Sequence, residues 1–134
     1  MPTERILIVE DDDSIRRAMV TVLGRAGYRV REASSGQEAT RMWKEEECDL
    51  VLTDIHMPDK DGIEMMRELR ELKPELPIIA VSGSGERTCR ALLSGANING
   101  AIRTLDKPFK IAELLDCVGQ LLESVAPRGS RRTE

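Results

Sequence analysis

Polar residues of three chemical types follow apolar segments at four places along the chain. In chain order these places hold Glu10 with Asp11, Asp54, Ser82 and Lys107. Carboxylates gathered in a small space repel one another unless a hard cation such as Mg²⁺ joins them. A carboxylate beside Mg²⁺ can attack a phosphoryl group, and an ammonium nearby would neutralise the oxygens of the group in transfer. These residue types therefore indicate a site that accepts a phosphoryl group, provided that the fold brings the four places together.

Five short segments are predicted to be the β-strands that carry these residues. They are RILIVE (5–10), YRVREA (28–33), DLVLTD (49–54), PIIAVSG (77–83) and AIRTLD (101–106). The first, third and fourth are nearly continuous apolar runs, which is typical of strands covered on both faces in a parallel sheet. The second and fifth carry charged residues between apolar ones, so we expect them nearer the sheet edges.

Amphipathic helical patterns fill the gaps between the strands. The first ends at Gly27 and has one apolar face, made of Ile15, Ala18, Met19, Val22, Leu23 and Ala26. SGQEATRMWKEEE begins with Ser35 as an N-cap and Glu38 as its capping-box partner, and DGIEMMRELREL ends before Pro74. The last pattern has one apolar face, made of Ile111, Leu114, Leu115, Val118, Leu121, Leu122 and Val125. Alternating strands and helices predict an α/β fold, in which ligands bind beyond the carboxyl ends of the strands.

Composition narrows the class of protein further. The chain has 134 residues and a net charge of −4, so we expect one domain over residues 1–125, a flexible polar tail over 126–134, and no direct binding of nucleic acid. It has no long apolar run, which predicts no membrane association and a cytoplasmic location. Cys48, Cys89 and Cys117 are far apart and form no CxxC motif, so free thiols are expected.

Four motifs in order resemble those of a response-regulator receiver domain of the CheY-like type. They are ILIVEDD, DLVLTDIHMPDKDG, PIIAVSG and LDKPF, and the intervals between them also fit over about residues 4–125. The resemblance implies a flavodoxin-like, three-layer α/β/α fold. Its five-stranded parallel sheet would have the order 2-1-3-4-5 and be flanked by five helices.

The resemblance also implies roles for the acidic residues. Asp54 would be the phosphoacceptor and also a Mg²⁺ ligand. Glu10 and Asp11 would be the acidic pair that binds the same Mg²⁺, with Asp11 the more direct ligand. The backbone carbonyl of His56 would complete the protein's share of the metal ligands, and Gly62 would shape the loop after Asp54. A zinc role for His56, the lone histidine, is not expected because it has no partner at a usual spacing.

Further roles implied by the resemblance concern the last two strands. Ser82 would be the switch hydroxyl and Ser84 would border the site. Lys107, before a cis bond to Pro108, would pair with Asp54 or with the phosphoryl oxygens. Thr104 would be the second switch residue, at a position where the family often has an aromatic one. The interval from Ser82 to Lys107 is slightly longer than usual, so a longer or displaced connection after the fourth strand is expected.

The residues around the site also have simpler readings. We expect Asp12, Asp13 or Ser14 to cap the first helix, and Met65 with Met66 to fill the core. The run SGSGE lacks the pattern of a phosphate-binding P-loop.

The functional expectation is a phosphoacceptor of a two-component phosphorelay that catalyses only its own phosphorylation and dephosphorylation. Its partners would be a histidine kinase or histidine phosphotransfer protein, a downstream protein, and a second copy if phosphorylation leads to a homodimer. Three alternatives stay open: a pseudo-receiver that binds proteins without phosphotransfer, the N-terminal receiver of a longer regulator, and an aspartyl-nucleophile phosphohydrolase. The phosphohydrolase would need a second acid where His56 stands.

Overall fold

The computed structural model describes residues 4–55, 62–82 and 102–124. The strands are β1 (Arg5–Val9), β2 (Arg29–Ala33), β3 (Leu50–Asp54), β4 (Ile78–Ser82) and β5 (Ile102–Asp106). The helices are α1 (Asp13–Arg25), α2 (Gly36–Glu45), α3 (Gly62–Leu72) and α5 (Ile111–Ser124). The predicted fourth helix and the predicted displaced connection after β4 both fall in residues 83–101, outside the described part.

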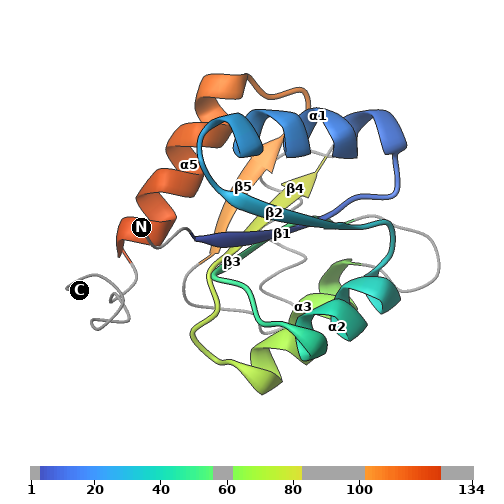
Figure 1. Cartoon of the computed structure of the whole chain (residues 1–134). Coiled ribbons are helices and arrows are strands. Elements are labelled where there is room, and N and C mark those ends of the chain that lie inside the picture. The colour runs from blue at the N-terminus through green and yellow to red at the C-terminus, as the bar shows by residue number, and fades with distance from the viewer. Residues whose placement is uncertain (1–3, 56–61, 83–101, 125–134) are drawn as a thin grey trace.

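All five strands form one parallel sheet with the order β2-β1-β3-β4-β5. This confirms the predicted order and the edge positions of the two charged strands. α1 and α5 cover one face of the sheet, and α2 and α3 cover the other (Figure 1). The structure is therefore a three-layer α/β/α arrangement. No helix within the described ranges is long and apolar enough to cross a membrane.

Two separate apolar layers hold the sheet between its helices. Because successive strand residues point to opposite faces, Leu7 and Val9 pack under α2 and α3, whereas Ile6 and Ile8 pack under α1 and α5. Every residue of β3 and of β4 is buried, as expected for central strands. The predicted core pair Met65 and Met66 is also fully buried, so the core prediction is confirmed there.

The ends of α1 and α2 agree with the predicted caps. Asp12 is the N-cap of α1, and its Oδ1 accepts a hydrogen bond from the Ile15 N–H at 3.0 Å. Gly27 has φ 103°, a left-handed conformation that favours glycine. Ser35 caps α2 and accepts from the Glu38 N–H at 3.1 Å, but the Glu38 carboxylate reaches back to the Ser34 N–H at 2.7 Å. The predicted capping box is thus one residue longer than the usual form.

Three residues of the predicted apolar faces are exposed in the described part of the chain, namely Ala18 and Ala26 of the first face and Ile111 of the last. Ile111 was expected on the buried face of the last helix, but its side chain is 60% exposed. It is the first residue of α5, so a full turn of helix separates it from the layer that Leu114 and Val118 enter. Leu115 and Leu122 are partly buried against the same layer.

Candidate functional site

The carboxyl ends of four neighbouring strands bring the predicted site residues to one end of the sheet. Asp54 and Ser82 are the last residues of β3 and β4, and Glu10 and Lys107 come directly after β1 and β5. The strands are parallel and in register, with Asp54 opposite Val81. Four sequence positions that are far apart therefore share one small region.

Lys107 is the centre of this region. Its Nζ donates to Asp54 Oδ2 at 3.0 Å and lies 3.2 Å from Glu10 Oε1. Asp54 is 6% exposed and Glu10 only 1% exposed, so both carboxylates lie under the surface. The bond that joins Lys107 to Pro108 is cis, as predicted.

Asp11 adds a third carboxylate to the two that Lys107 contacts. Ligand oxygens of Glu10, Asp11 and Asp54 all lie within 4.8 Å of one another, and Asp11 is exposed at the rim. Glu10 Oε1 is buried and, among the described residues, accepts no hydrogen bond of good geometry despite its ion-pair contact with Lys107. Excess negative charge and a buried oxygen short of a partner both suit a hard cation with oxygen ligands. The cluster is therefore compatible with a Mg²⁺ site.

The pKa values of Glu10 and Lys107, the two partners of this ion pair, are shifted by different balances of burial and charge. Burial raises the pKa of Glu10, and the nearby Asp54 charge raises it further, against the hydrogen bond from the Asp12 N–H and the attraction of Lys107. Burial by itself would lower the pKa of Lys107. The hydrogen bond to Asp54 and the attraction of Asp54 and Glu10 outweigh it, so the Lys107 pKa is raised and the ammonium stays charged.

The backbone around Asp54 is held by short contacts. Its carbonyl oxygen accepts a hydrogen bond from Thr53 Oγ1 at 2.8 Å. The Ile55 N–H donates to Val81 O at 3.0 Å, and the Gly62 N–H donates to Ile55 O at 2.9 Å. The start of α3 therefore closes directly onto the end of β3, which limits how far Asp54 can move.

The residues predicted for the switch lie on the two strands farthest from β2. Ser82 is fully buried and is paired in register with Asp106. Thr104 is half-buried and lies opposite Ala80, two residues before Ser82 on the same face of the sheet. His56 and Ser84, predicted as a metal ligand and a rim residue, lie outside the described residues.

Arg16 belongs to none of the motifs, although it contacts the backbone of the acidic pair. Its Nη1 donates to the Glu10 carbonyl at 2.8 Å. A sequence signal did exist, because an arginine three residues after Asp13 on a helix can pair with it. That signal indicates a surface ion pair and says nothing of a link to Glu10.

An apolar groove lies beside the site, between α1 and α5. Its volume is about 570 Å³. It is lined by Ile15, Ala18, Met19, Val22, Lys107, Pro108, Phe109, Ile111 and Leu114. The groove therefore shares Lys107 with the acidic cluster and contains the exposed Ile111 side chain.

Comparison with known proteins gives a consistent result. The family model described as the response regulator receiver domain matches residues 6–119. The response regulator receiver protein CpdR of Brucella abortus (strain 2308) is 36% identical over 119 residues, which is 89% of this chain and 97% of that protein. The crystallised chemotaxis protein CheY4 of Vibrio cholerae has a TM-score of 0.82 and 26% identity, and the match covers 90% of this chain and 99% of that one.

A longer relative matches over a similar region. The DNA-binding transcriptional regulator NtrC of Bradyrhizobium sp. (strain RP501 Parasponia) is 34% identical over 130 residues. The match covers 97% of this chain but 26% of the regulator. The chain therefore spans about a quarter of that relative's length.

Proposed function

Because the chain belongs to the response regulator receiver domain family of two-component signalling, we propose that it accepts a phosphoryl group on Asp54 from a phosphohistidine. The observation that carries this proposal is the position of Asp54 beside two further carboxylates and 3.0 Å from the Lys107 ammonium. A carboxylate at the end of a central strand, with a cation beside it, is arranged for attack on an electrophilic phosphorus.

The proposed reaction is a direct displacement at phosphorus. An Asp54 carboxylate oxygen forms a bond to phosphorus as the bond from phosphorus to the imidazole nitrogen breaks, and the electron pair of that bond stays on the imidazole. Lys107 is placed to bind an oxygen of the transferred group, because it already holds Asp54 Oδ2. Asp11 and Asp54, with Glu10 behind them, would hold Mg²⁺, which would neutralise charge on the phosphoryl oxygens.

We also propose that the donor is a protein, namely a histidine kinase or a histidine phosphotransfer protein. A phosphohistidine that reaches Asp54 would come close to Lys107, because the ammonium lies 3.0 Å from the Asp54 carboxylate, and Lys107 also lines the apolar groove. A donor that covers the site would bury the groove and the exposed Ile111 side chain with it. Burial of apolar surface would hold the donor in place while the group is transferred.

The proposed output is a change of conformation that a downstream protein recognises. Phosphorylation adds about −1.5 to −2 of charge and three strong acceptor oxygens. Ser82 ends the strand beside Asp54, so its hydroxyl is close enough in the fold to move toward such acceptors. The chain would catalyse only the gain and loss of its own phosphoryl group.

The test is phosphorylation by a small phosphodonor such as acetyl phosphate. We expect labelling of the wild-type protein that depends on Mg²⁺, and no labelling of Asp54→Asn. Asp106→Asn is a matched control, because Asp106 is an exposed strand-end acid outside the acidic cluster. Unchanged labelling of Asp54→Asn, or no labelling of the wild type at any Mg²⁺ concentration, would contradict the proposal.

A further inference from the structure

Arg16 makes three contacts that meet at the start of the site. Its Nη1 donates to the Glu10 carbonyl oxygen at 2.8 Å, its Nε donates to Glu32 Oε1 at 2.9 Å, and its Nη2 contacts Asp13 Oδ1. The side chain is only 12% exposed, although Arg16 lies in the first turns of a surface helix. The guanidinium therefore lies against the body of the protein.

These contacts join three elements. Glu10 follows β1, Asp13 begins α1, and Glu32 belongs to β2. α1 starts at the end of the sheet where β1 and β2 finish (Figure 1). One side chain thus ties the turn that carries the acidic pair to the strand beside it and to the helix after it.

The bond to the Glu10 carbonyl acts on the acidic pair itself. That carbonyl belongs to the peptide unit that joins Glu10 to Asp11, and a peptide unit is planar. A hydrogen bond that fixes its oxygen therefore fixes the direction in which the Asp11 Cα leaves the turn. The Asp11 side chain is exposed, so packing against neighbours does little to orient it.

The rest of Glu10 is held by other partners. Its N–H donates to Ala33 O at 3.1 Å, its Oε2 accepts from the Asp12 N–H at 3.1 Å, and its Oε1 lies 3.2 Å from Lys107 Nζ. The carbonyl held by Arg16 completes this set. Without Arg16, the peptide unit between the two acids would be free to rotate toward water.

Arginine suits this task for a reason of geometry. Its planar guanidinium offers donors in several fixed directions, whereas a lysine ammonium is a flexible point charge. Asp13 and Glu32 each contribute a negative charge at the guanidinium, which limits the repulsion that Arg16 would exert on a cation at the acidic cluster.

We propose that Arg16 is a positioning residue for the Mg²⁺ site, acting through the peptide unit between Glu10 and Asp11. The inference rests on the proposed function, since it assigns a role in the same site. Some groups hydrogen-bond to metal ligands and orient them without touching the metal. Removing such a group weakens metal binding by about 10- to 100-fold. We expect a loss of Mg²⁺ affinity near the lower end of that range, because Arg16 orients only Asp11, and does so through the backbone.

The test is the Mg²⁺ affinity of the unphosphorylated protein, measured by titration calorimetry on the wild type and on Arg16→Met. Two explanations predict opposite signs. If only charge mattered, removing a cation near the site would strengthen Mg²⁺ binding. If Arg16 orients the acids, Arg16→Met weakens it about tenfold. Mg²⁺ affinity in Arg16→Met equal to or tighter than in the wild type would overturn the inference.

Labelling by acetyl phosphate gives a second readout. In Arg16→Met we expect the Mg²⁺ concentration for half-maximal labelling to rise by a similar factor, while the rate at saturating Mg²⁺ stays close to that of the wild type. A reduced maximal rate with an unchanged Mg²⁺ dependence would also overturn the inference. Absence of Mg²⁺ binding or labelling in the wild type would instead contradict the proposed function.

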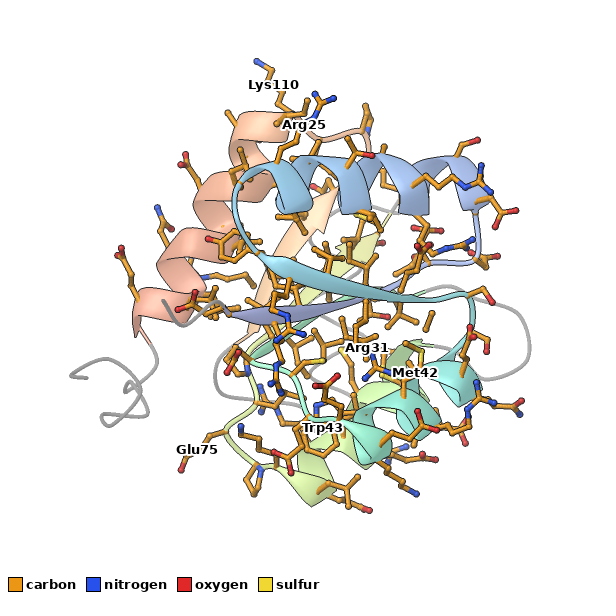
Figure 2. All side chains as sticks on the ribbon, viewed as in Figure 1. Arg25, Arg31, Met42, Trp43, Glu75 and Lys110 are labelled. Carbon is orange, nitrogen blue, oxygen red and sulfur yellow. The ribbon has the colours of Figure 1, made fainter. Side chains whose placement is uncertain are left out.

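Arg31→Met is the matched control. Arg31 also donates from a half-buried guanidinium to backbone carbonyls, at 3.2 Å from Met42 O and 3.4 Å from Glu46 O. Arg31 belongs to β2 and lies beside Met42 of α2 (Figure 2), and its partners Met42, Glu45 and Glu46 are not members of the acidic cluster. We expect the Mg²⁺ affinity of Arg31→Met to match that of the wild type. An equal loss of Mg²⁺ affinity in Arg16→Met and Arg31→Met would overturn the inference. Thermal unfolding checks that each variant folds.

If Arg16→Met does not fold, Arg16→Lys decides the question. Lysine keeps the charge and one donor, so we expect a folded protein with a Mg²⁺ affinity below that of the wild type. An Arg16→Lys affinity equal to or above that of the wild type would then overturn the inference.

Discussion

Gly62 lies against the backbone of Asp54. A Cβ atom at position 62 would be 2.1 Å from the Asp54 carbonyl oxygen and 2.9 Å from the Ile55 Cα. Both neighbours are backbone atoms, so neither can rotate away as a side chain would. The first residue of α3 is therefore a glycine, because β3 ends where a side chain at this position would be.

Gly62→Ala should lower both stability and phosphorylation. The strand end must shift to make room, and overpacking of this kind lowers the free energy of unfolding by about 1–3 kcal/mol. Because Asp54 moves with its carbonyl, labelling by acetyl phosphate should slow as well. Chemical denaturation and initial labelling rates measure the two effects.

Gly24→Ala provides the control for that change. Gly24 also lies in a helix, but a Cβ there would meet nothing within 4 Å. Replacing a helical glycine by alanine stabilises by about 0.5–1 kcal/mol, so the two substitutions should have opposite signs. Equal stabilities for the two variants would contradict the close approach of Gly62 to Asp54.

Lys107→Met should separate metal binding from phosphorylation. Without the ammonium, the three carboxylates lose a competing cation, so Mg²⁺ should bind more tightly. The labelling rate should fall nonetheless, because the Lys107 ammonium no longer binds the phosphoryl oxygens. Calorimetry and labelling at saturating Mg²⁺ measure the two quantities.

Lys110→Met is the comparison for the lysine. Lys110 is exposed, and its side chain points away from the protein (Figure 2). The Mg²⁺ affinity and the labelling rate of Lys110→Met should both stay near their wild-type values. If Lys107→Met weakened Mg²⁺ binding, the view that Lys107 and the metal compete for the same carboxylates would be wrong.

The strand pattern predicted more of the site than the helix pattern did. Apolar runs placed β1, β3 and β4 at the centre, and strand ends then brought Asp54 near Lys107. Residue type and strand position do not say which carboxylate the lysine binds, because that depends on side-chain directions between residues more than 50 positions apart. The combined contacts of Arg16 could not be predicted for the same reason: its partners come from three different elements, and the sequence does not show that their side chains meet. Periodicity also placed Ile111 in the core, because a pattern does not show how far a helix extends past the sheet.

Glu38→Gln should destabilise the protein at neutral pH and not in acid. The hydrogen bond from the Ser34 N–H lowers the pKa of Glu38 below its ordinary value of 4.5. A lowered folded-state pKa means that the ionised form stabilises the fold above that ordinary value, and that this stabilisation is lost as pH falls through the folded-state pKa. Glutamine keeps an acceptor but not the charge. The difference in melting temperature between wild type and Glu38→Gln should therefore shrink as the pH falls below about 4.5.

The size of that effect should be small. The Glu38 side chain is 36% exposed, and charges at a solvated helix start contribute about 0.3–1 kcal/mol at low salt. Added salt should reduce the difference at pH 7 as well. A difference that stayed constant from pH 7 to pH 3 would mean that the hydrogen bond to Ser34 does not depend on the ionised carboxylate.

Ile111→Lys should slow phosphotransfer from a protein donor without affecting a small one. The side chain is 60% exposed, so the free energy of unfolding should change by no more than about 0.5 kcal/mol. A charge in the groove would have to be desolvated under a docked donor, which weakens docking. Acetyl phosphate does not need the groove, so its labelling rate should stay unchanged. Leu72→Lys is the matched control, because Leu72 is a 51% exposed apolar residue at the end of α3, on the other face of the sheet. Transfer from a purified histidine phosphotransfer domain that labels the wild type gives the measurement. Equal slowing in both variants, or slower labelling of Ile111→Lys by acetyl phosphate, would contradict donor docking on this groove.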